Sequence, residues 1–491
     1  MPGDPQQRRF ALGAGTAVVT GVVLRLWIVL VARPTCPRIN VSGQSGCFNV
    51  GGDSVFGYWQ GRLLAAGHGY IDPVSWYLDG RKVRPSAGKP PLYPAALALL
   101  DRIGIDSANG QRIVLALIGS VTIWVVAVLA RRLGGERGVR VGVIAAWLAA
   151  LTPALWINDT MFQVEPLSTL VMALVLLVAY RFWSAPSLPD AFALAALLGV
   201  GAMLRAEMQF MVPAVLWPVV ALAATWSWRR RLGVAAAGTL VAVALWAPWL
   251  IYNQGRFAAA SPWAMTTGSG AVLVSAYCDE TFYGDAIGYW AAHCFEQPLA
   301  TRLRPGESLT EAVDRVTGDR ETTRLLTEAG RVQARGTTVT VDVTRDVLDE
   351  SQYYAVTAHT AVLYAEGHLT RLPVVVVARL GWTFGVFRPF HAAWIDGTVE
   401  GRGKASAIAS LFVWWASAAL AIWGGVLLRR RKVTLVPILG VVAVVAGTTA
   451  VSFGVMRYRV PVDLCAILLA AVALDHAWHL RRRPPLPEAP V

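Results

Sequence analysis

The first long polar segment of the sequence, Gly51 to Pro94, carries an acid, an amide, a base and many aromatic residues. Asp53 follows two glycines, so the backbone can turn sharply and present the carboxylate. This carboxylate can accept a proton from an attacking hydroxyl group, or it can cap a helix that begins near Ser54. We interpret Asp53 as the candidate catalytic base, and Gln60 and Tyr93 as candidate substrate-binding residues.

A basic residue stands near the end of the same segment. Lys89 precedes two consecutive prolines, which stiffen the chain and fix its direction. A stiffly held ammonium group can neutralise a phosphate, and the alternative is a lysine that only extends its charge from the membrane interface into water. We predict that Lys89 binds a phosphate group.

Two further acids, Asp159 and Glu165, lie six residues apart between two apolar segments. A single helix would not place them on the same face. Either residue can assist Asp53, orient an acceptor, bind a metal ion or cap a helix. We group both with Asp53 as candidate catalytic residues.

Two more charged pairs flank apolar segments later in the chain. Arg457 and Arg459 stand two apart in the run MRYRVP and can hold phosphate oxygens together, or they can anchor the chain at the membrane interface. Arg205 and Glu207 in MLRAEMQF can contact substrate or pair with each other. Because ionisable groups at membrane depth are costly and tend to be functional, we predict phosphate binding by the first pair and substrate binding by the second.

These residues are embedded in a strongly apolar chain. Of its 491 residues, 55% are hydrophobic and 15% are charged, whereas soluble domains contain about 25% charged residues. The net charge of +13 resides in short clusters at the ends of apolar runs, as the positive-inside rule requires. No basic face with interleaved aromatic residues indicates a nucleic-acid partner. The sequence therefore predicts an all-α, multi-pass protein of the cell membrane.

Ten apolar segments are predicted to span the membrane. With both termini in the cytoplasm, every strong arginine cluster falls on the cytoplasmic side and the candidate site falls on the outer face. The ten segments are residues 11–31, 113–130, 141–156, 166–180, 191–204, 208–226, 232–252, 405–428, 433–451 and 460–478.

The predicted spans divide the chain into four parts. We expect an interfacial helix over residues 91–103, soluble helices over 321–332 and 351–366, and an apolar segment over 374–386 that dips into the bilayer. The parts are an N-terminal membrane unit (1–252) with the first outer loop (32–109), an outer polar region (253–404), C-terminal spans (405–480) and a disordered tail (481–491).

Four of the five cysteines form two close pairs on segments predicted to lie outside. Cys36 and Cys47 belong to the first outer loop, and Cys278 and Cys294 belong to the outer polar region. Two disulfides in an oxidising compartment and four free thiols both fit this spacing. No CxxC motif is present, which argues against a structural zinc site.

The order of these motifs resembles the GT-C class of membrane glycosyltransferases, in particular the branch of protein O-mannosyltransferases and lipid A aminoarabinose transferases. The pieces that carry the resemblance are GGDSVFGYWQGRLLAAGHGY, KPPLYP, INDTMFQVEPL, LRAE, an APW segment followed by Asn253, and RYRVPVD. It implies a bundle of about ten helices with interfacial helices on the first outer loop. It also implies a sugar donor carried on a polyprenyl phosphate and an inverting displacement at the anomeric carbon.

Residue by residue, the resemblance implies that Asp53 acts as general base and that Lys89, Arg457 and Arg459 hold the donor phosphate. The chain departs from protein mannosyltransferases where they carry two adjacent acids, because serine follows Asp53 here. This leaves an envelope glycan, a lipid or a protein open as acceptor. The segment 277–294 does not match the characterised transferases, and we assign it to acceptor binding.

Two other functions compete with this interpretation. A transporter of lipid-linked sugars predicts charges at mid-span and broken helices in paired halves, whereas the charges here stand at outer ends. An envelope scaffold predicts that Asp53 is dispensable. No cofactor is required by any motif, and a divalent metal ion is left open because acids and histidines are present without diagnostic spacing.

Overall fold

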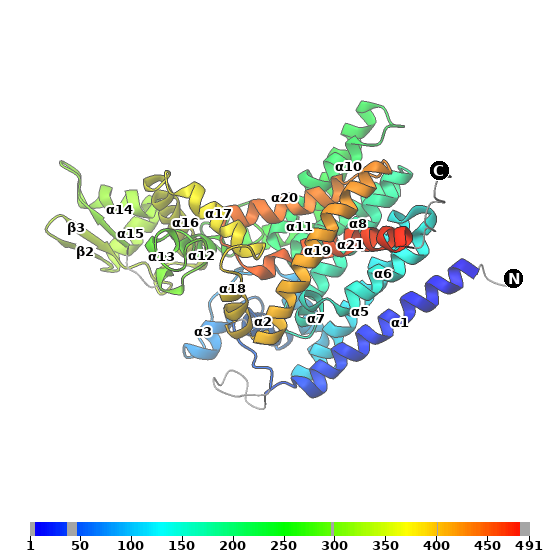
Figure 1. Cartoon of the computed structure of the whole chain (residues 1–491). Helices are drawn as coiled ribbons and strands as arrows, with labels where there is room; N and C mark the ends of the chain where they lie inside the picture. Colours follow the sequence, from blue (N-terminus) through cyan, green and yellow to red (C-terminus); the bar gives the residue numbers. More distant parts are fainter. Residues whose placement is uncertain (1–4, 37–46, 296–298, 400, 482–491) are drawn as a thin grey trace.

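The computed structural model describes residues 5–36, 47–295, 299–399 and 401–481. Almost all of its regular structure is helical, so the predicted all-α class is confirmed, with one small sheet as the exception. A long helical bundle occupies one end of the molecule and a small mixed unit the other (Figure 1). Apart from Arg481, the predicted disordered tail lies outside the described residues.

The chain is a multi-pass membrane protein. Within the described residues, six helical segments are long and apolar enough to cross a membrane, and two bent pairs raise that number to as many as eight. The six are α1 with η1 (Pro5–Ala32), α5 (Ala108–Leu133), α8 (Glu165–Ser184), α11 (Trp228–Gln254), α19 (Lys404–Arg430) and η6 with α21 (Met456–Arg481).

The remaining apolar helices are bent or short. One bent pair joins η2 and α6 (Gly135–Leu151) to α7 (Pro153–Asp159) at 56°, and the other joins α16 (Glu350–Gly367) to α17 (Leu372–Thr383) at 119°. Every predicted span coincides with a long helix, a bent pair or a short helix, but the number of about ten is not confirmed. The short helices are α9 (Leu188–Leu204), η3 to α10 (Ala206–Ala221) and α20 (Val436–Val451).

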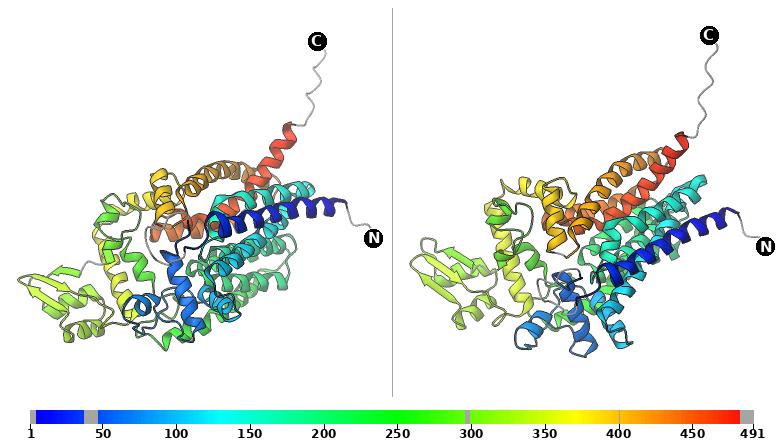
Figure 2. Two further views of the ribbon diagram at one scale, coloured as in Figure 1. Left: turned by 90° about the horizontal axis from the view of Figure 1, so that it is seen from below. Right: turned by 60° about the horizontal axis from the view of Figure 1, so that its bottom comes forward.

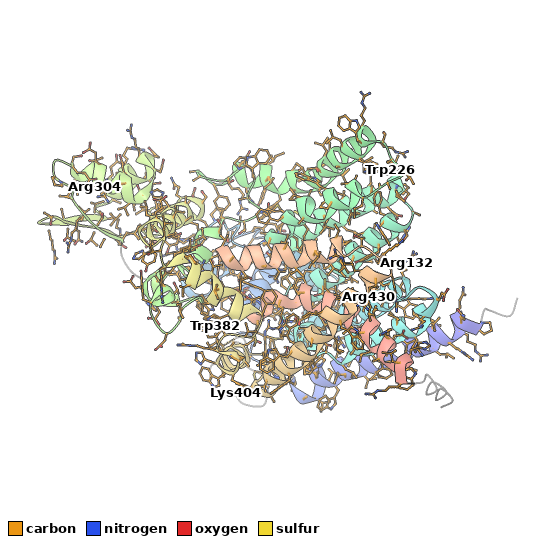
Figure 3. All side chains as sticks on the ribbon, turned by 45° about the horizontal axis from the view of Figure 1, so that its top comes forward. Arg132, Trp226, Arg304, Trp382, Lys404 and Arg430 are labelled. Carbon is orange, nitrogen blue, oxygen red and sulfur yellow. A yellow bond between two sulfur atoms is a disulfide. The ribbon has the colours of Figure 1, made fainter. Side chains whose placement is uncertain are left out.

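The arginine clusters gather at one end of this bundle. Arg132 in the last turn of α5 and Arg430 at the end of α19 lie far from Arg304, which belongs to the small mixed unit (Figure 3). Helix α1 begins and α21 ends at the same end as these arginines (Figure 1). The bundle therefore has a basic end and an opposite end, as the positive-inside pattern requires.

The first outer loop folds into three helices, α2 (Asp53–Ala65), α3 (Pro73–Leu78) and α4 (Leu92–Arg102). The last of these is the predicted interfacial helix. Helices α2 and α4 pack closely because α2 presents glycines toward α4. A Cβ atom at Gly57 would stand 2.6 Å from the Tyr93 ring, and one at Gly61 would stand 2.8 Å from the Leu97 side chain. The loop is therefore an ordered platform at the end of the bundle opposite the arginines.

The small mixed unit, residues 299–348, is called the outer module here. Its antiparallel strands β1 (Leu299–Arg302), β2 (Val332–Arg335) and β3 (Thr338–Val341) are ordered β1-β3-β2. Helices α14 (Leu309–Thr317) and α15 (Arg320–Glu328) share a core with the sheet. The module stands apart from the bundle in both views of Figure 2.

The sequence analysis did not predict this sheet. The expected helix over 321–332 is correct for α15 but wrong at its end, because Val332 opens β2. The expected helix over 351–366 is α16, and the apolar segment over 374–386 is α17. The structure also joins Cys36 to Cys47 and Cys278 to Cys294 in disulfides.

Candidate functional site

A cavity of about 940 Å³ lies beside the first outer loop. Its walls come from the start of α2, the turn before α4, the start of α8, the segment 204–214, the segment 264–273 and α20. The segment 264–273 includes most of helix α12 (Ser269–Val274). Most of the cavity wall is apolar, with side chains including Met172, Met208, Phe210, Met211, Leu273, Val444, Val445 and Val451.

The polar part of the cavity wall carries six charged side chains that alternate in sign. They form a continuous series of ion pairs, and every member lines the cavity. In order, the series, called the charge chain here, is Lys89, Asp53, Arg457, Glu165, Arg205 and Glu207. Three cations and three anions leave it without net charge.

The first half of the charge chain centres on Asp53. Lys89 Nζ lies 3.0 Å from Asp53 Oδ1, and a guanidinium nitrogen of Arg457 donates to Asp53 Oδ2. The other side of the same guanidinium lies 3.5 Å from Glu165 Oε1. Both Asp53 and Lys89 keep more than a third of their side chains exposed, at 37% and 46%. Solvent or a ligand can therefore reach this end of the chain.

The second half runs deeper into the protein. Arg205 Nη1 donates to Glu165 Oε1 over 2.9 Å, and Arg205 Nε donates to Glu207 Oε1 over 2.5 Å. The side chain of Glu165 is only 1% exposed, and that of Arg205 is 12% exposed. Because Glu165 accepts from one arginine and lies beside a second, it joins the two halves of the charge chain.

Helix ends and breaks place these side chains. Asp53 and Glu165 are the first residues of α2 and α8, where the partial positive charge of a helix N-terminus favours an acid. Gly52 precedes Asp53 with φ +55°, a left-handed conformation that permits the sharp turn. Arg205 lies at the break between α9 and η3, and Arg457 lies in the short helix η6 (Met456–Arg459). Helix termini thus converge on one wall of the cavity.

The electrostatic surroundings of Asp53 keep it ionised. The Lys89 ammonium group, followed by the Arg457 guanidinium, lowers the pKa of the Asp53 carboxyl well below its usual value, against the opposing effect of burial. The possible helix-capping role of Asp53 is not the arrangement observed, since its two carboxylate oxygens bind these two cations.

Among the described residues of the cavity wall, two buried side-chain oxygens lack a hydrogen-bond partner. These are the Tyr93 hydroxyl oxygen and Glu165 Oε2. Buried polar groups are normally paired, and both residues line the cavity. Burial also raises the pKa of the Tyr93 phenol, so that it remains a neutral donor. The pair therefore offers an unsatisfied donor and an unsatisfied acceptor to a ligand with hydroxyl groups.

Seven of the ten residues predicted for catalysis, donor-phosphate binding or substrate binding line the cavity, namely Tyr93 and the six members of the charge chain. The other three lie elsewhere. Asp159 forms a buried ion pair with Arg25 of α1 over 2.7 Å. Gln60 of α2 is buried, and its amide nitrogen lies 3.5 Å from the Ile71 carbonyl oxygen. Arg459 pairs with Asp463 over 3.1 Å.

The expected clamp of Arg457 and Arg459 is separated by the geometry of η6. In a 3₁₀-helix residues three apart eclipse one another, so residues two apart point to different sides. Arg457 enters the cavity, whereas Arg459 turns into the packed interior and stacks 4.2 Å from the Trp414 ring centroid.

Gln163 was not among the residues predicted from the sequence. Its amide oxygen accepts from Arg457 Nη1 over 3.1 Å, and its amide nitrogen donates to the Ser54 hydroxyl over 3.2 Å. Gln163 therefore connects Ser54, the second residue of α2, to Arg457 of the charge chain. Its position two residues before Glu165 in INDTMFQVEPL was the available signal.

The residues of the site do not form an evident metal-ligand set. Within the described parts of the chain, no three histidine, cysteine, aspartate or glutamate side chains gather around a common point. The three carboxylates of the charge chain are instead each bound to a lysine or arginine. The arrangement thus provides cations of its own for an anionic ligand.

Comparison with known proteins connects this site to a family. A family model described as dolichyl-phosphate-mannose-protein mannosyltransferase matches residues 88–252. The matched range contains Lys89, Tyr93, Glu165, Arg205 and Glu207 of the cavity wall. No curated protein matches the sequence.

The fold is similar to that of a solved structure. The archaeal oligosaccharyltransferase AglB from Archaeoglobus fulgidus, in complex with an inhibitory peptide and a dolichol-phosphate, aligns with a TM-score of 0.51 and 14% identity. The alignment covers 96% of this chain and 51% of AglB, so the chain spans about half the length of that protein. ArnT from Cupriavidus metallidurans, bound to undecaprenyl phosphate, aligns with a TM-score of 0.38 and 14% identity over 98% of this chain and 82% of ArnT. The predicted GT-C fold is confirmed.

Proposed function

We propose that this chain, which belongs to the GT-C class of membrane glycosyltransferases, transfers a sugar from a polyprenyl-phosphate donor to a hydroxyl acceptor. The observation that carries the proposal is the joining of a long apolar wall and a charged wall in one cavity. An isoprenoid chain suits the apolar wall, and a phosphate bearing a sugar suits the charged wall. The AglB structure holds a dolichol-phosphate, and we infer a donor of the same chemical class here.

Lys89 and Arg457 are the residues that we assign to the donor phosphate. Both cations bind Asp53 in the free protein, and both present nitrogens that form charge-assisted hydrogen bonds with phosphate oxygens. A bound phosphate would compete with the carboxylate for these nitrogens. Donor binding would thereby loosen the hold on Asp53 and release it for chemistry.

Asp53 is the residue that we assign as general base. The acceptor hydroxyl would lose its proton to the carboxylate as its oxygen bonds to the anomeric carbon. The bond from that carbon to the phosphate oxygen would break, and the polyprenyl phosphate would leave with the electron pair. Because the leaving group is already a phosphate, the protein contributes mainly positioning and charge stabilisation by Lys89 and Arg457.

The unpaired atoms of Tyr93 and Glu165 are our candidates for binding the sugar. The Tyr93 hydroxyl can donate to a sugar oxygen, and Glu165 Oε2 can accept from a sugar hydroxyl. Arg205 and Glu207 continue the same wall. A hydroxyl of an envelope glycan, a lipid or a protein is the proposed acceptor, with the disulfide-bonded segment 277–294 as its candidate contact region.

The proposed orientation places the cavity on the outer face and both termini in the cytoplasm. The arginine clusters at the opposite end of the bundle support it (Figure 3). The two disulfides lie in the first outer loop and in the outer polar region, where an oxidising compartment would maintain them.

The test is transfer of labelled sugar from a panel of synthetic polyprenyl-phosphate donors by the purified chain, compared with Asp53→Asn. Removing a general base lowers the rate by about 10²- to 10⁴-fold, and we expect that loss with retained binding of polyprenyl phosphate. Asp106→Asn, which neutralises an exposed acid of the same loop, is the matched control and should turn over normally.

Unchanged turnover in Asp53→Asn would exclude this residue as the base and direct attention to Glu165. Donor binding followed by neither transfer nor donor hydrolysis, with any acceptor class, would favour a transporter. Absence of both donor binding and turnover would favour a scaffold.

A further inference from the structure

Glu350, the first residue of α16, lies behind the turn that carries Lys89. Its side chain is 2% exposed and is absent from the cavity wall. One oxygen, Oε1, accepts from the Ala87 backbone N–H over 2.7 Å and from the Thr267 hydroxyl. The other, Oε2, accepts from Arg345 Nη2 over 3.0 Å. One buried carboxylate thus binds three different segments of the chain.

Two of these segments form neighbouring parts of the cavity wall. Ala87 stands two residues before Lys89, and Thr267 belongs to the segment 264–273. The backbone N–H of Thr267 also donates to the Ala87 carbonyl over 3.0 Å. A Cβ atom at Gly268 would stand 2.7 Å from the Gly88 carbonyl oxygen, so the two segments touch with no room between them. Glu350 holds this contact closed from behind.

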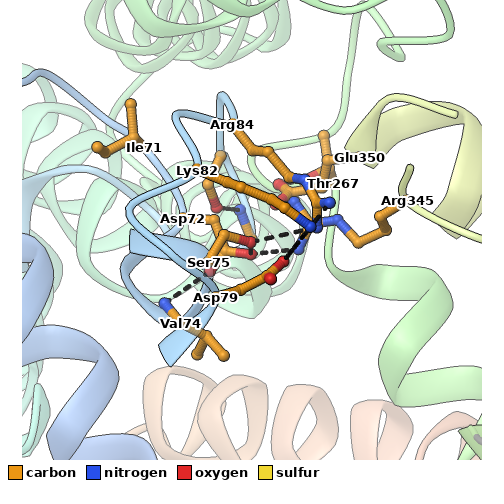
Figure 4. Close-up of polar contacts among 12 residues, drawn as sticks. Ile71, Asp72, Val74, Ser75, Asp79, Lys82, Arg84, Thr267, Arg345 and Glu350 are labelled. Carbon is orange, nitrogen blue, oxygen red and sulfur yellow. Dashed lines mark hydrogen bonds and ion pairs between the residues drawn. The ribbon is translucent and has the colours of Figure 1, made fainter. Parts of the chain in front are cut away.

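The third segment is the C-terminal end of the outer module. Arg345 bridges Asp72 of the first outer loop and Glu350 (Figure 4). Beside this bridge, Arg84 pairs with Asp346. The module is therefore attached to the platform of the first outer loop through a network of ion pairs. The network ends at the turn that carries the candidate phosphate-binding lysine.

We infer that Glu350 is a positioning residue for Lys89: it fixes the turn from Ala87 to Lys89 and links the outer module to donor-phosphate binding. The inference rests on the proposed role of Lys89 in the proposed function. A carboxylate that accepts a backbone N–H and a neighbouring hydroxyl fixes both groups in direction as well as in distance. Small displacements of a binding group away from its productive position have large effects on binding and rate.

The experiment measures the dissociation constant of undecaprenyl phosphate for the purified full chain, together with thermal unfolding. Glu350→Ala removes every hydrogen bond of the carboxylate, and we expect about tenfold weaker binding. Glu350→Gln keeps an oxygen acceptor for Ala87 and Thr267, and we expect it to restore binding to within about threefold of the unmodified chain. In turnover, Glu350→Ala should raise the KM for the donor more than it lowers kcat.

Two further variants keep the test informative if Glu350→Ala folds poorly. Thr267→Val removes one hydrogen bond to Glu350 at constant shape and should weaken binding by about threefold. Asp346→Asn breaks the exposed ion pairs of the same joint, at a side chain that is 54% exposed and does not contact Ala87. It is the matched control and should bind undecaprenyl phosphate normally.

The outcomes separate the two proposals. Lys89→Ala binding undecaprenyl phosphate as tightly as the unmodified chain would overturn the assigned phosphate site and the inference with it. A second outcome would overturn the positioning role alone. In it, Lys89→Ala binds weakly, but Glu350→Gln and Thr267→Val bind as tightly as the unmodified chain. Glu350→Ala then loses no more affinity than Asp346→Asn does. Lower unfolding temperatures with unchanged dissociation constants in the Glu350 variants would show a purely structural residue.

Discussion

Two kinds of ion pair occur near the end of the bundle opposite the arginine clusters, and only one kind faces the cavity. In the charge chain, the side chains of Asp53 and Lys89 are 37% and 46% exposed. In the pair of Arg459 with Asp463 the corresponding values are 1% and 5%. The pair of Arg25 with Asp159 is equally enclosed. All these residues are acids and bases of similar sequence setting, yet their surroundings differ completely.

The difference separates groups that can change partner from groups that cannot. Removing one member of a buried ion pair lowers the free energy of unfolding by several kcal/mol, because an uncompensated charge remains in the interior. The charge chain instead ends in accessible groups and includes Glu165, which keeps an unpaired oxygen. A ligand can therefore replace a protein partner in the charge chain without burying an isolated charge. We expect mutations in the two kinds of pair to affect different measurements.

The largest expected effect is on stability, from Arg459→Gln. This substitution leaves Asp463 buried without its cation and removes the contact with Trp414, so we expect a loss of about 3–5 kcal/mol in the free energy of unfolding. Thermal or denaturant unfolding of the purified chain measures it. Activity per folded molecule should remain close to normal. A large loss of donor affinity at unchanged stability would instead place Arg459 in donor binding, as the sequence predicted.

The matched variant in the charge chain is Arg457→Gln. The cation that we assign to the phosphate is lost, and we expect donor affinity to fall about hundredfold. A titration with polyprenyl phosphate measures this effect. Stability should change less than in Arg459→Gln, since the partner Asp53 is partly exposed and keeps Lys89. If both variants changed stability and donor affinity equally, the two kinds of ion pair would not differ in function.

The sequence could not separate Arg457 from Arg459, and the reason is geometric. Spacing in the run MRYRVP does not reveal whether the segment is a strand, in which residues two apart share a face, or the 3₁₀-helix η6, in which they point to different sides. The same limit applies to Asp159, whose partner Arg25 is 134 residues away. The residue types of the site were predictable, whereas the directions of the side chains were not.

Fold prediction succeeded where the signal was long and failed where it was short. Apolar segments and arginine clusters located the long apolar helices of the described residues, although the helix ends differ from the predicted ends by up to six residues. The strands of the outer module have four residues each, too few for their alternation to stand out beside amphipathic helices. The hairpin residue Gly336, at φ +61°, was the local signal in ARGTTVTV.

A pH profile examines the electrostatic part of the comparison. The pKa of Asp53 is lowered in the folded chain, chiefly by Lys89, so the stabilisation from this pairing is complete above the unfolded value and is lost as pH falls through the lowered one. The ionised carboxylate is the active form of a base. Transfer should therefore persist at pH values below the usual carboxylate range.

Lys89→Gln removes the largest cause of this lowering. We expect the acid limb of kcat/KM, which reports the free enzyme, to move to higher pH by about one unit. An acid limb that stays in place would show that Asp53 is not the group being titrated. A shift to lower pH would contradict the sign of the electrostatic effect.

The smallest expected effect comes from Tyr93→Phe, and it distinguishes sugar binding from phosphate binding. The Tyr93 hydroxyl has no hydrogen-bond partner in the described structure, so removing it should leave stability unchanged or slightly higher. If this hydroxyl binds the sugar, the KM for the sugar-bearing donor should rise about fivefold. Affinity for polyprenyl phosphate without a sugar should stay the same, because Lys89 and Arg457 are untouched. An equal loss of affinity for both ligands would instead assign Tyr93 to phosphate binding. The part of the cavity in which a ligand can replace a protein partner would then extend beyond the charge chain to α4.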